Sequence, residues 1–215
     1  MSPPGAVRIG IVDYGVGNRR NVEKALEHAG AQPVLTADQE ALAATDGLVV
    51  PGVGAFAAAM ERLRATGLDA FVTGRAAAGM PVLGLCLGMQ LLFERSSELG
   101  GDEGLGLLEG RVVALAPAPA TLKVPHIGWN VVTFTRAHPL LDGLGGAAAF
   151  YHVHSYVAVP EHEDDVLGRG DYGGPFVSIV GRGRIFGAQF HPEKSSSAGL
   201  RLLANFSALC ARAPA

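Results

Sequence analysis

Two patterns of apolar and polar positions alternate along the first half of the chain. Short apolar runs, several of them rich in β-branched residues, predict strands at Val7–Val12, Pro33–Leu35, Gly47–Val50 and Pro81–Leu85. Amphipathic segments between these runs predict helices at Asn21–Ala29, Gln39–Ala44, Ala55–Gly74 and Gly88–Glu94. Strands that alternate with helices in this way favour a parallel sheet with helices on both faces.

The second half of the chain has a different pattern. From Arg111 to Gly187, short alternating runs predict antiparallel strands and hairpins added to the sheet, at Val131–Thr135, Tyr151–Val159 and Val177–Val180. Leu200–Ala211 is amphipathic and predicts a closing helix. The expected fold class is therefore α/β. We expect a flavodoxin-like three-layer sandwich with a mostly parallel central sheet, helices on both faces and added antiparallel strands in the second half.

Length and composition add that the chain folds as a globular protein. The 215 residues are 48% hydrophobic and 17% charged, which predicts one domain spanning residues 1–215. The net charge is −3 and no basic cluster occurs, so we expect neither nucleic acid nor an anionic membrane surface as a partner.

Three further features bear on where the protein works. The start of the chain, Met-Ser-Pro-Pro, lacks the features of a secretory signal peptide, and the two cysteines lie far apart, so we expect a cytoplasmic location. The segment Ala76–Phe93 is uncharged over 18 residues. Because Pro81 and several glycines interrupt it, we do not expect it to span a membrane.

The segment Gly84-Leu85-Cys86-Leu87-Gly88 lies where a buried strand is expected to turn into a helix. This is the layout of a nucleophile elbow with cysteine in place of serine. Side chains at the two glycine positions would collide with the neighbouring strand and helix. A helix N-terminus also favours the thiolate form of Cys86. A buried structural cysteine is the alternative, but the spacing favours a catalytic one.

A partner for Cys86 is found in Phe190-His191-Pro192-Glu193. Residues two apart in an extended chain face the same side, so His191 and Glu193 can lie together. The imidazole would accept the thiol proton while the carboxylate orients the ring. A surface turn with two solvated polar groups would explain His-x-Glu equally well by itself. Its coincidence with the cysteine elbow favours a catalytic triad.

Other segments carry weaker signals. Pro51-Gly52-Val53-Gly54 is interpreted as a turn whose backbone N–H groups point toward a developing oxyanion. Gly15-Val16-Gly17 lacks the third glycine of a dinucleotide-binding loop, because Arg20 stands at that position. No carboxylate or cysteine at ligand spacing joins His152 and His154, so we expect a packed or interface role and no metal site. Cys210 is expected to fill the core.

Together these segments resemble the class I, triad-type glutamine amidotransferases. The segments DYGVGN, PGVGAF, GLCLGMQLLFERS, HIGWN, YHVHSY and FGAQFHPEKS occur in this order from end to end. They are similar to those of the glutaminase subunits of imidazole glycerol phosphate synthases in histidine biosynthesis. HIGWN, YHVHSY and the lysine of HPEKS discriminate this group, because the elbow and HPE would serve any glutaminase of the class.

The resemblance implies a role for each matching residue. Cys86 would be the nucleophile, His191 the general base and acid, and Glu193 the orienting carboxylate. Gly52 and Val53 would form the oxyanion region together with the N–H of Leu87. Gln90 and Glu98 would hold the amino-acid end of glutamine. The face toward a partner would carry Asn18, Tyr151 and Lys194. The loop Gly100–Gly106 gives no firm match.

The resemblance also implies a partner and a reaction. Glutamine would be hydrolysed to glutamate and ammonia, with no cofactor, and the ammonia would pass to a (β/α)8-barrel cyclase subunit of a heterodimer. The cyclase would make imidazole glycerol phosphate and an aminoimidazole carboxamide ribonucleotide. Two alternatives stay open. One is a glutaminase subunit of anthranilate or aminodeoxychorismate synthase, which should lack HIGWN and YHVHSY. The other is a non-enzymatic flavodoxin-like cysteine protein, which would have no use for His191 and Glu193.

Overall fold

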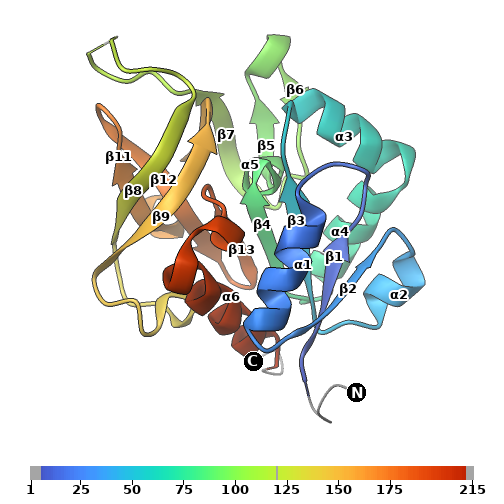
Figure 1. Ribbon diagram of the computed structural model, residues 1–215. Helices are drawn as coiled ribbons and strands as arrows, with labels where there is room; N and C mark the ends of the chain where they lie inside the picture. The colour runs from blue at the N-terminus through green and yellow to red at the C-terminus, as the bar shows by residue number, and fades with distance from the viewer. Residues whose placement is uncertain (1–5, 120, 212–215) are drawn as a thin grey trace.

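The computed structural model describes residues 6–119 and 121–211 and contains one large mixed sheet. Its parallel part has the strand order β2 (Gln32–Thr36), β1 (Arg8–Val12), β3 (Gly47–Gly52), β4 (Val82–Cys86) and β13 (Ile185–Ala188). Each neighbouring pair in this series is parallel. The expected parallel sheet is therefore confirmed, and β4, which ends at Cys86, lies between β3 and β13 (Figure 1).

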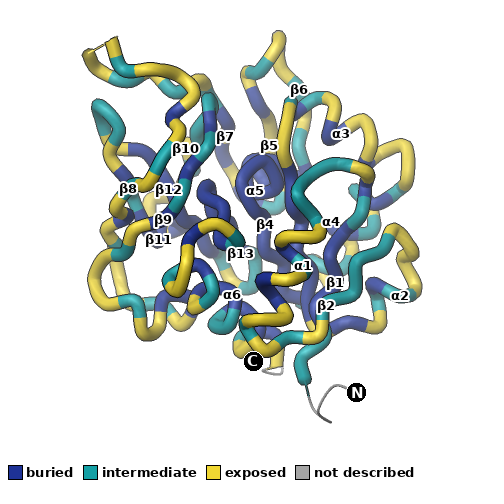
Figure 2. Tube along the Cα trace, viewed as in Figure 1, coloured by how far each residue is buried: buried dark blue, intermediate teal, exposed yellow. Residues whose placement is uncertain are grey.

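Helices cover both faces of this parallel part. On one face lie α1 (Arg19–His28) and α6 (Ser196–Cys210), which share a buried apolar cluster with Ile9 and Ile11 of β1. On the other face lie α2 (Gln39–Ala43), α3 (Phe56–Ala65) and α4 (Leu68–Ala77), which share a second cluster with Val12 and Val50. The three-layer α/β arrangement expected from the sequence is confirmed. Buried residues concentrate in the central strands between the helices (Figure 2).

Mostly antiparallel strands extend the sheet beyond β13, as expected for the second half of the chain. The sheet continues through β12 (Pro175–Arg182), β10 (Tyr156–Pro160), β7 (Leu108–Ala114), β5 (Phe93–Ser96) and β6 (Asp102–Glu103). Among these neighbours only β7 and β5 pair in parallel. A branch leaves β12 through β11 (Val166–Asp171), β8 (His126–Phe134) and β9 (Ala147–His154). The 3-10 helices are η1 (Glu98–Gly100), η2 (Pro139–Leu141), η3 (Glu163–Asp165) and η4 (Pro192–Lys194). The branch brings β9 back beside the segment that follows β13, where His152 bridges to Phe190.

Two expected helices are wrong in extent. The helix expected over Ala55–Gly74 is divided into α3 and α4 at Gly67, whose φ of 66° is left-handed and ends the first helix. The helix expected over Gly88–Glu94 is the short α5 (Leu87–Leu91), and the chain then becomes strand β5. Pairing of β5 with β7 is a long-range interaction that the local pattern does not contain.

Expected strand ends also differ from the structure. The strand expected over Tyr151–Val159 is two strands, β9 and β10, interrupted at Ser155. The strand expected to end at Val50 continues to Gly52, because Pro51 and Gly52 pair with Leu85 and Cys86 of β4. The closing helix begins at Ser196 rather than Leu200. Among the described residues, no helix has the length and apolar character needed to cross a membrane.

Candidate active site

Cys86 occupies a strained turn between β4 and α5. Its φ of 54° and ψ of −113° are rare for a residue other than glycine, as expected for a nucleophile elbow. A Cβ at Gly84 would lie 2.4 Å from the carbonyl oxygen of Gly88, and one at Gly88 would lie 1.8 Å from that of Val50. The steric reason expected for both glycines is therefore confirmed. Close backbone packing at these positions holds the cysteine at the end of β4.

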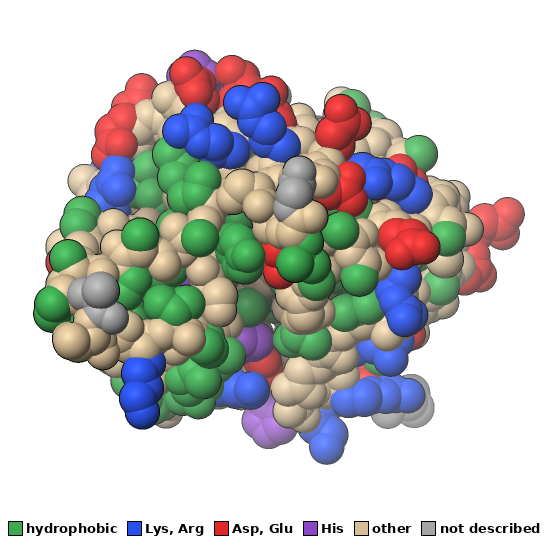
Figure 3. All heavy atoms as spheres, turned by 90° about the horizontal axis from the view of Figure 1, so that it is seen from above, with side chains coloured by type: hydrophobic (Ala, Val, Ile, Leu, Met, Phe, Trp, Pro, Cys, Tyr) green, Lys and Arg blue, Asp and Glu red, His purple; other side chains and the backbone are tan. Residues whose placement is uncertain are grey.

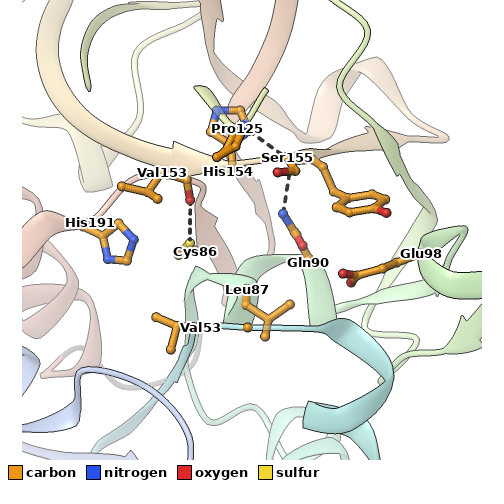
Figure 4. Close-up of a pocket in the computed structure, with 12 residues that line it drawn as sticks. Val53, Cys86, Leu87, Gln90, Glu98, Pro125, Val153, His154, Ser155 and His191 are labelled. Atoms are coloured by element: carbon orange, nitrogen blue, oxygen red, sulfur yellow. Dashed lines mark hydrogen bonds between the residues drawn. The ribbon is translucent and has the colours of Figure 1, made fainter. Parts of the chain in front are cut away.

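A pocket of about 290 Å³ opens at Cys86. It lies between the parallel strands and the segment that joins β9 to β10, and its lining residues are Val53, Gly54, Cys86, Leu87, Gln90, Glu98, Pro125, Val153, His154, Ser155, Tyr156 and His191. In Figure 4, His191 lies on one side of Cys86, with Gln90 and Glu98 on the other. Seen from above, the molecule is hollowed between its two halves, and histidine atoms are visible in the hollow (Figure 3).

His191 is placed to exchange protons with the cysteine. It lies just after β13, and its Nδ1 is 2.9 Å from Oε1 of Glu193, so the two buried side chains form an ion pair when the ring is protonated. Burial lowers the pKa of His191. Interactions with Cys86 and Glu193 outweigh this effect and raise the pKa to about 9. The sequence-predicted Cys86, His191 and Glu193 are thus brought together in an arrangement that can hold an imidazolium beside a thiolate.

Gln189 is a neighbour of Cys86 that the sequence reasoning missed. Its side-chain Nε2 lies 4.0 Å from Sγ of Cys86, and its Oε1 accepts a hydrogen bond of 3.0 Å from Nε2 of Gln90. On the other side, the thiol is 3.7 Å from the carbonyl oxygen of Val153. The signal was present in the sequence, because Gln189 precedes His191 by two residues and positions two apart in an extended chain share a face.

The expected oxyanion region lies beside the nucleophile. Gly52 pairs with Cys86 across β3 and β4, and Leu87 begins α5 directly after the cysteine. Val53 lines the pocket and is partly exposed. Contrary to the expected turn, Gly52 still belongs to β3, and the positive φ of 94° occurs at Gly54. Gly52 is required for another reason, since a Cβ there would lie 2.8 Å from Oη of Tyr14.

The two expected glutamine-binding residues both line the pocket but make different contacts. The Nε2 group of Gln90 donates to the carbonyl oxygen of Tyr156 at 3.1 Å as well as to Gln189, which fixes the direction of the amide. Oε2 of Glu98 accepts a hydrogen bond of 2.7 Å from the backbone N–H of Phe56, at the first residue of α3. Glu98 therefore also caps a helix, a role that its sequence context did not indicate.

The residues expected at a partner interface lie around the triad. Lys194 is exposed directly after Glu193, and its Nζ is 5.9 Å from the ring centroid of Tyr151. The carbonyl oxygen of Tyr151 accepts a hydrogen bond of 2.9 Å from the backbone N–H of His191. Asn18 precedes α1 and lines a small cavity of about 10 Å³ together with His191 and Glu193. All three therefore lie close to His191 and Glu193.

An apolar strip on β8 was also missed. Ile127, Trp129 and Val131 alternate along the strand and are 60%, 55% and 59% exposed. Opposite Trp129 on β9 is Tyr151, and their ring centroids are 6.1 Å apart. The sequence signal was the apolar alternation of the strand itself. It could not show which face of β8 is covered by the rest of the protein.

His152 and His154 are packed in the interior, which is one of the two roles expected for them. Together with His126 they form a buried cluster in which Nδ1 of His126 lies 3.0 Å from Nε2 of His154. Burial, together with the neighbouring histidines, lowers the pKa of His152 to about 3 and that of His154 to about 4. Within the described ranges, no group of three or more histidine, cysteine or acidic residues is arranged to hold a metal ion.

Cys210, as expected, belongs to the core. Its side chain is buried in α6, and burial raises the pKa of its thiol to about 12. Its Sγ lies only 2.3 Å from the position that a Cβ on Gly47 would occupy, so it packs directly against that glycine. Cys210 is therefore a packing residue whose thiol stays protonated at neutral pH.

Comparison with known proteins agrees with this geometry. The family model for glutamine amidotransferase class-I matches residues 10–209. The chain is 50% identical over 203 residues to the imidazole glycerol phosphate synthase subunit HisH of Salinibacter ruber, and the match covers 93% of each protein. It is 51% identical over 199 residues to the HisH subunit of Symbiobacterium thermophilum, covering 93% of this chain and 92% of that one.

Solved structures show the same fold. A crystal structure of a glutamine amidotransferase superposes with a TM-score of 0.74 at 23% identity and covers 94% of this chain and 98% of that one. The structure of PurLQS from Thermotoga maritima superposes with a TM-score of 0.71 at 19% identity, covering 94% of this chain and 97% of that one. By its sequence, the chain belongs to the class I glutamine amidotransferases and, within them, to the HisH subunits of imidazole glycerol phosphate synthase.

Proposed function

We propose that this chain hydrolyses glutamine to glutamate and ammonia with Cys86, His191 and Glu193, and that it supplies the ammonia for histidine biosynthesis in the cytoplasm. The whole of residues 1–215 would form this one amidotransferase domain. The observation that carries the proposal is that the strained Cys86 shares a pocket with His191, whose ring is paired with the buried carboxylate of Glu193. The proposal accounts for the pocket without a cofactor or a metal ion.

The first half of the reaction would form a thioester. The Cys86 thiolate attacks the side-chain amide carbon of glutamine, and a tetrahedral intermediate with a negatively charged oxygen results. The N–H groups of Leu87 and of the Gly52-Val53 segment would stabilise that oxygen, since Leu87 follows Cys86 directly and Gly52 pairs with it across the strands. The His191 imidazolium then donates its proton to the leaving nitrogen, the C–N bond breaks, and ammonia departs.

The second half would release glutamate. Neutral His191 takes a proton from a water molecule, which attacks the thioester carbon and forms a second tetrahedral intermediate. The C–S bond breaks, the Cys86 thiolate returns, and the imidazolium is restored. Glu193 stabilises the imidazolium in both halves, because its carboxylate lies 2.9 Å from Nδ1. Gln90 and Glu98 are at the opposite end of the pocket, where the α-amino and α-carboxylate groups of glutamine would bind.

A HisH protein is one subunit of a synthase, which implies a partner subunit. We propose that the partner is a (β/α)8-barrel cyclase and that it docks on the face formed by Asn18, Tyr151, Lys194 and the apolar strip Ile127, Trp129 and Val131. Exposed apolar and aromatic side chains of this kind are typical of protein interfaces. A partner docked over His191 and Glu193 would keep ammonia away from water, where protonation would remove its nucleophilicity.

The triad is tested by replacing the nucleophile in the complex. We expect Cys86→Ala to abolish glutamine hydrolysis while synthesis by the partner from added ammonia continues. Cys210→Ala is the matched control, because it removes the other free thiol from the core and should leave hydrolysis in place. Glutamate release and ammonia-dependent synthesis are measured on the same samples. Glutamine-dependent turnover by Cys86→Ala at the wild-type rate would refute the assignment.

The docking face is tested by measuring how tightly the two proteins bind each other. Trp129→Ala should weaken association by about 10- to 100-fold, the range for a buried aromatic at an interface. Lys194→Ala should weaken association or reduce the coupling between the subunits. Val159→Ala changes another exposed apolar residue, on β10, and should have no effect. Wild-type affinity and coupling in both Trp129→Ala and Lys194→Ala would show that the partner binds elsewhere.

A further inference from the structure

Tyr14 belongs to the segment DYGVGN, which the proposed mechanism does not use. It lies two residues after β1 and is only 3% exposed, in the apolar cluster that also contains Phe56 and Leu87. Its phenol donates a hydrogen bond of 2.5 Å to the carbonyl oxygen of Pro51. A buried hydroxyl so placed binds the backbone of β3 at the end that adjoins the nucleophile.

This hydrogen bond fixes a peptide unit in the oxyanion region. The carbonyl of Pro51 and the N–H of Gly52 belong to one planar peptide, and in a trans peptide they point in opposite directions. Anchoring the carbonyl of Pro51 to Tyr14 therefore also sets the direction of the Gly52 N–H. Gly52 is the residue that pairs with Cys86 across β3 and β4. The anchor therefore holds the end of β3, from which the Gly52–Val53 segment continues beside the nucleophile.

Close packing supports the same contact. Oη of Tyr14 lies 2.8 Å from the position that a Cβ on Gly52 would occupy, so glycine is needed for the hydroxyl to reach the strand. Gly17 of the same segment also faces Gly52, since a Cβ there would be 3.6 Å from the Gly52 N and Cα atoms. Burial and the neighbouring Cys86 hold the pKa of Tyr14 well above its usual range, so the phenol remains a donor at neutral pH.

We infer that Tyr14 is a positioning residue for the oxyanion site: its hydroxyl holds the Pro51–Gly52 peptide in the orientation that serves the nucleophile. Tyr14 is not among the residues that line the pocket and would act only through the backbone of β3. The inference rests on the proposed glutaminase function. It leaves the next peptide, between Gly52 and Val53, without this anchor.

The test removes one oxygen atom. In the complex with the partner subunit, Tyr14→Phe keeps the ring in the core and deletes only the donor. We expect kcat for glutamine hydrolysis to fall about 10-fold or more, within the ~10²–10³-fold effect of losing one oxyanion donor, with KM for glutamine within about twofold of wild type. Alkylation of Cys86 by iodoacetamide should keep its wild-type rate, because displacement at a saturated carbon forms no oxyanion.

Tyr172→Phe is the matched control, since Tyr172 also donates its phenol to a backbone carbonyl, that of Lys123 at 2.9 Å. It should keep the wild-type kcat. Two results would overturn the inference: an unchanged kcat in Tyr14→Phe, or a parallel loss of hydrolysis and alkylation, which would indicate general distortion around Cys86. Absence of hydrolysis in the wild-type complex would instead contradict the proposed function, so the two failures are distinguishable.

Discussion

His191 and the histidines of β8 and β9 lie close together at or beside the pocket, yet they have opposite electrostatic properties. All of them are buried, and His152 bridges to Phe190, the residue next to His191. The pKa of His191 is raised to about 9, whereas that of His152 is lowered to about 3. His191 faces a thiol and a carboxylate. His152 faces other histidines and the hydroxyl of Ser178, which lies 2.9 Å from its Nε2.

The difference shows that burial alone does not decide the charge of a histidine. Burial disfavours the imidazolium in both places, and only a neighbouring negative group reverses the effect. His191 is therefore suited to donate and accept protons, and the β8–β9 histidines are suited to remain neutral packing groups next to the pocket. Replacing His191 and its partners, or His152 and its partners, tests this difference in charge.

The largest expected effect comes from removing the two histidines in turn. His191→Ala should lower the rate of glutamine hydrolysis by ~10²–10⁴-fold, the usual contribution of a positioned acid–base group. His152→Gln should reduce kcat less than tenfold, although it disturbs a buried hydrogen bond. Steady-state hydrolysis by the two variants in the complex is the measurement. An equal loss of hydrolysis in both variants would mean that His152 shares the proton transfer with His191.

Next in size is the effect of the carboxylate. Glu193→Gln removes the charge beside His191, so the pKa of the ring should fall and the imidazolium should be lost at lower pH. We expect the alkaline limb of the kcat/KM profile to move down by at least about one pH unit. Glu163→Gln, at an exposed ion pair with Arg169, is the control and should leave the limb in place. An unshifted limb in Glu193→Gln would assign the limb to another group.

A smaller effect is expected on stability, with opposite signs for the two histidines. Between about pH 6.5 and 9 the folded protein retains a proton on His191 that the unfolded chain has released, so stability falls as pH rises through this window. Between about pH 6.5 and 3 the unfolded chain binds a proton that folded His152 excludes, so stability falls as pH decreases. Each slope is at most about 1.4 kcal/mol per pH unit.

Denaturant unfolding at a series of pH values checks these signs. His191→Gln should flatten the alkaline side of the stability profile and leave the acid side, whereas His152→Gln should do the reverse. If both variants flatten the same side, the contrast between the two regions is wrong.

The smallest expected effect is that of Ser178→Ala. It removes the hydroxyl partner of His152 and should cost about 1 kcal/mol of unfolding free energy, the typical value for one hydrogen bond. The kcat of the complex should not change, because the Ser178 hydroxyl contacts His152 and not the triad. If kcat falls although the variant is still fully folded under the assay conditions, His152 and Ser178 contribute to glutamine hydrolysis.

Most elements of the parallel half could be predicted because their signals are local. Apolar runs fixed β1, β3 and β4, and the two glycines around Cys86 indicated the elbow that the structure contains. The failures occurred where long-range pairing overrides local pattern. The helix expected over Gly88–Glu94 included Phe93 and Glu94, but these residues begin β5, because that segment pairs with β7.

The proposed triad residues were found from the sequence, but the residues that position them or their neighbours were not. Cys86, His191 and Glu193 carry recognisable spacing, and the structure brings them together. Gln189 could have been found from its place two residues before His191, although its contact with Cys86 spans 103 positions of the chain. Tyr14 contacts a residue 37 positions away, and no local pattern indicates that contact. The helix-capping contact of Glu98 with Phe56 was missed for the same reason.

The sequence by itself determined the α/β class, the strained cysteine turn and the pairing of a histidine with a carboxylate two residues later, since these depend on steric and periodic rules within a few residues. Only the tertiary structure decided which histidine becomes charged and which stay neutral. It also decided that a tyrosine from the first loop anchors the Pro51–Gly52 peptide. The reason is that pKa values and peptide orientations depend on the groups that folding places nearby, whatever their separation in the chain.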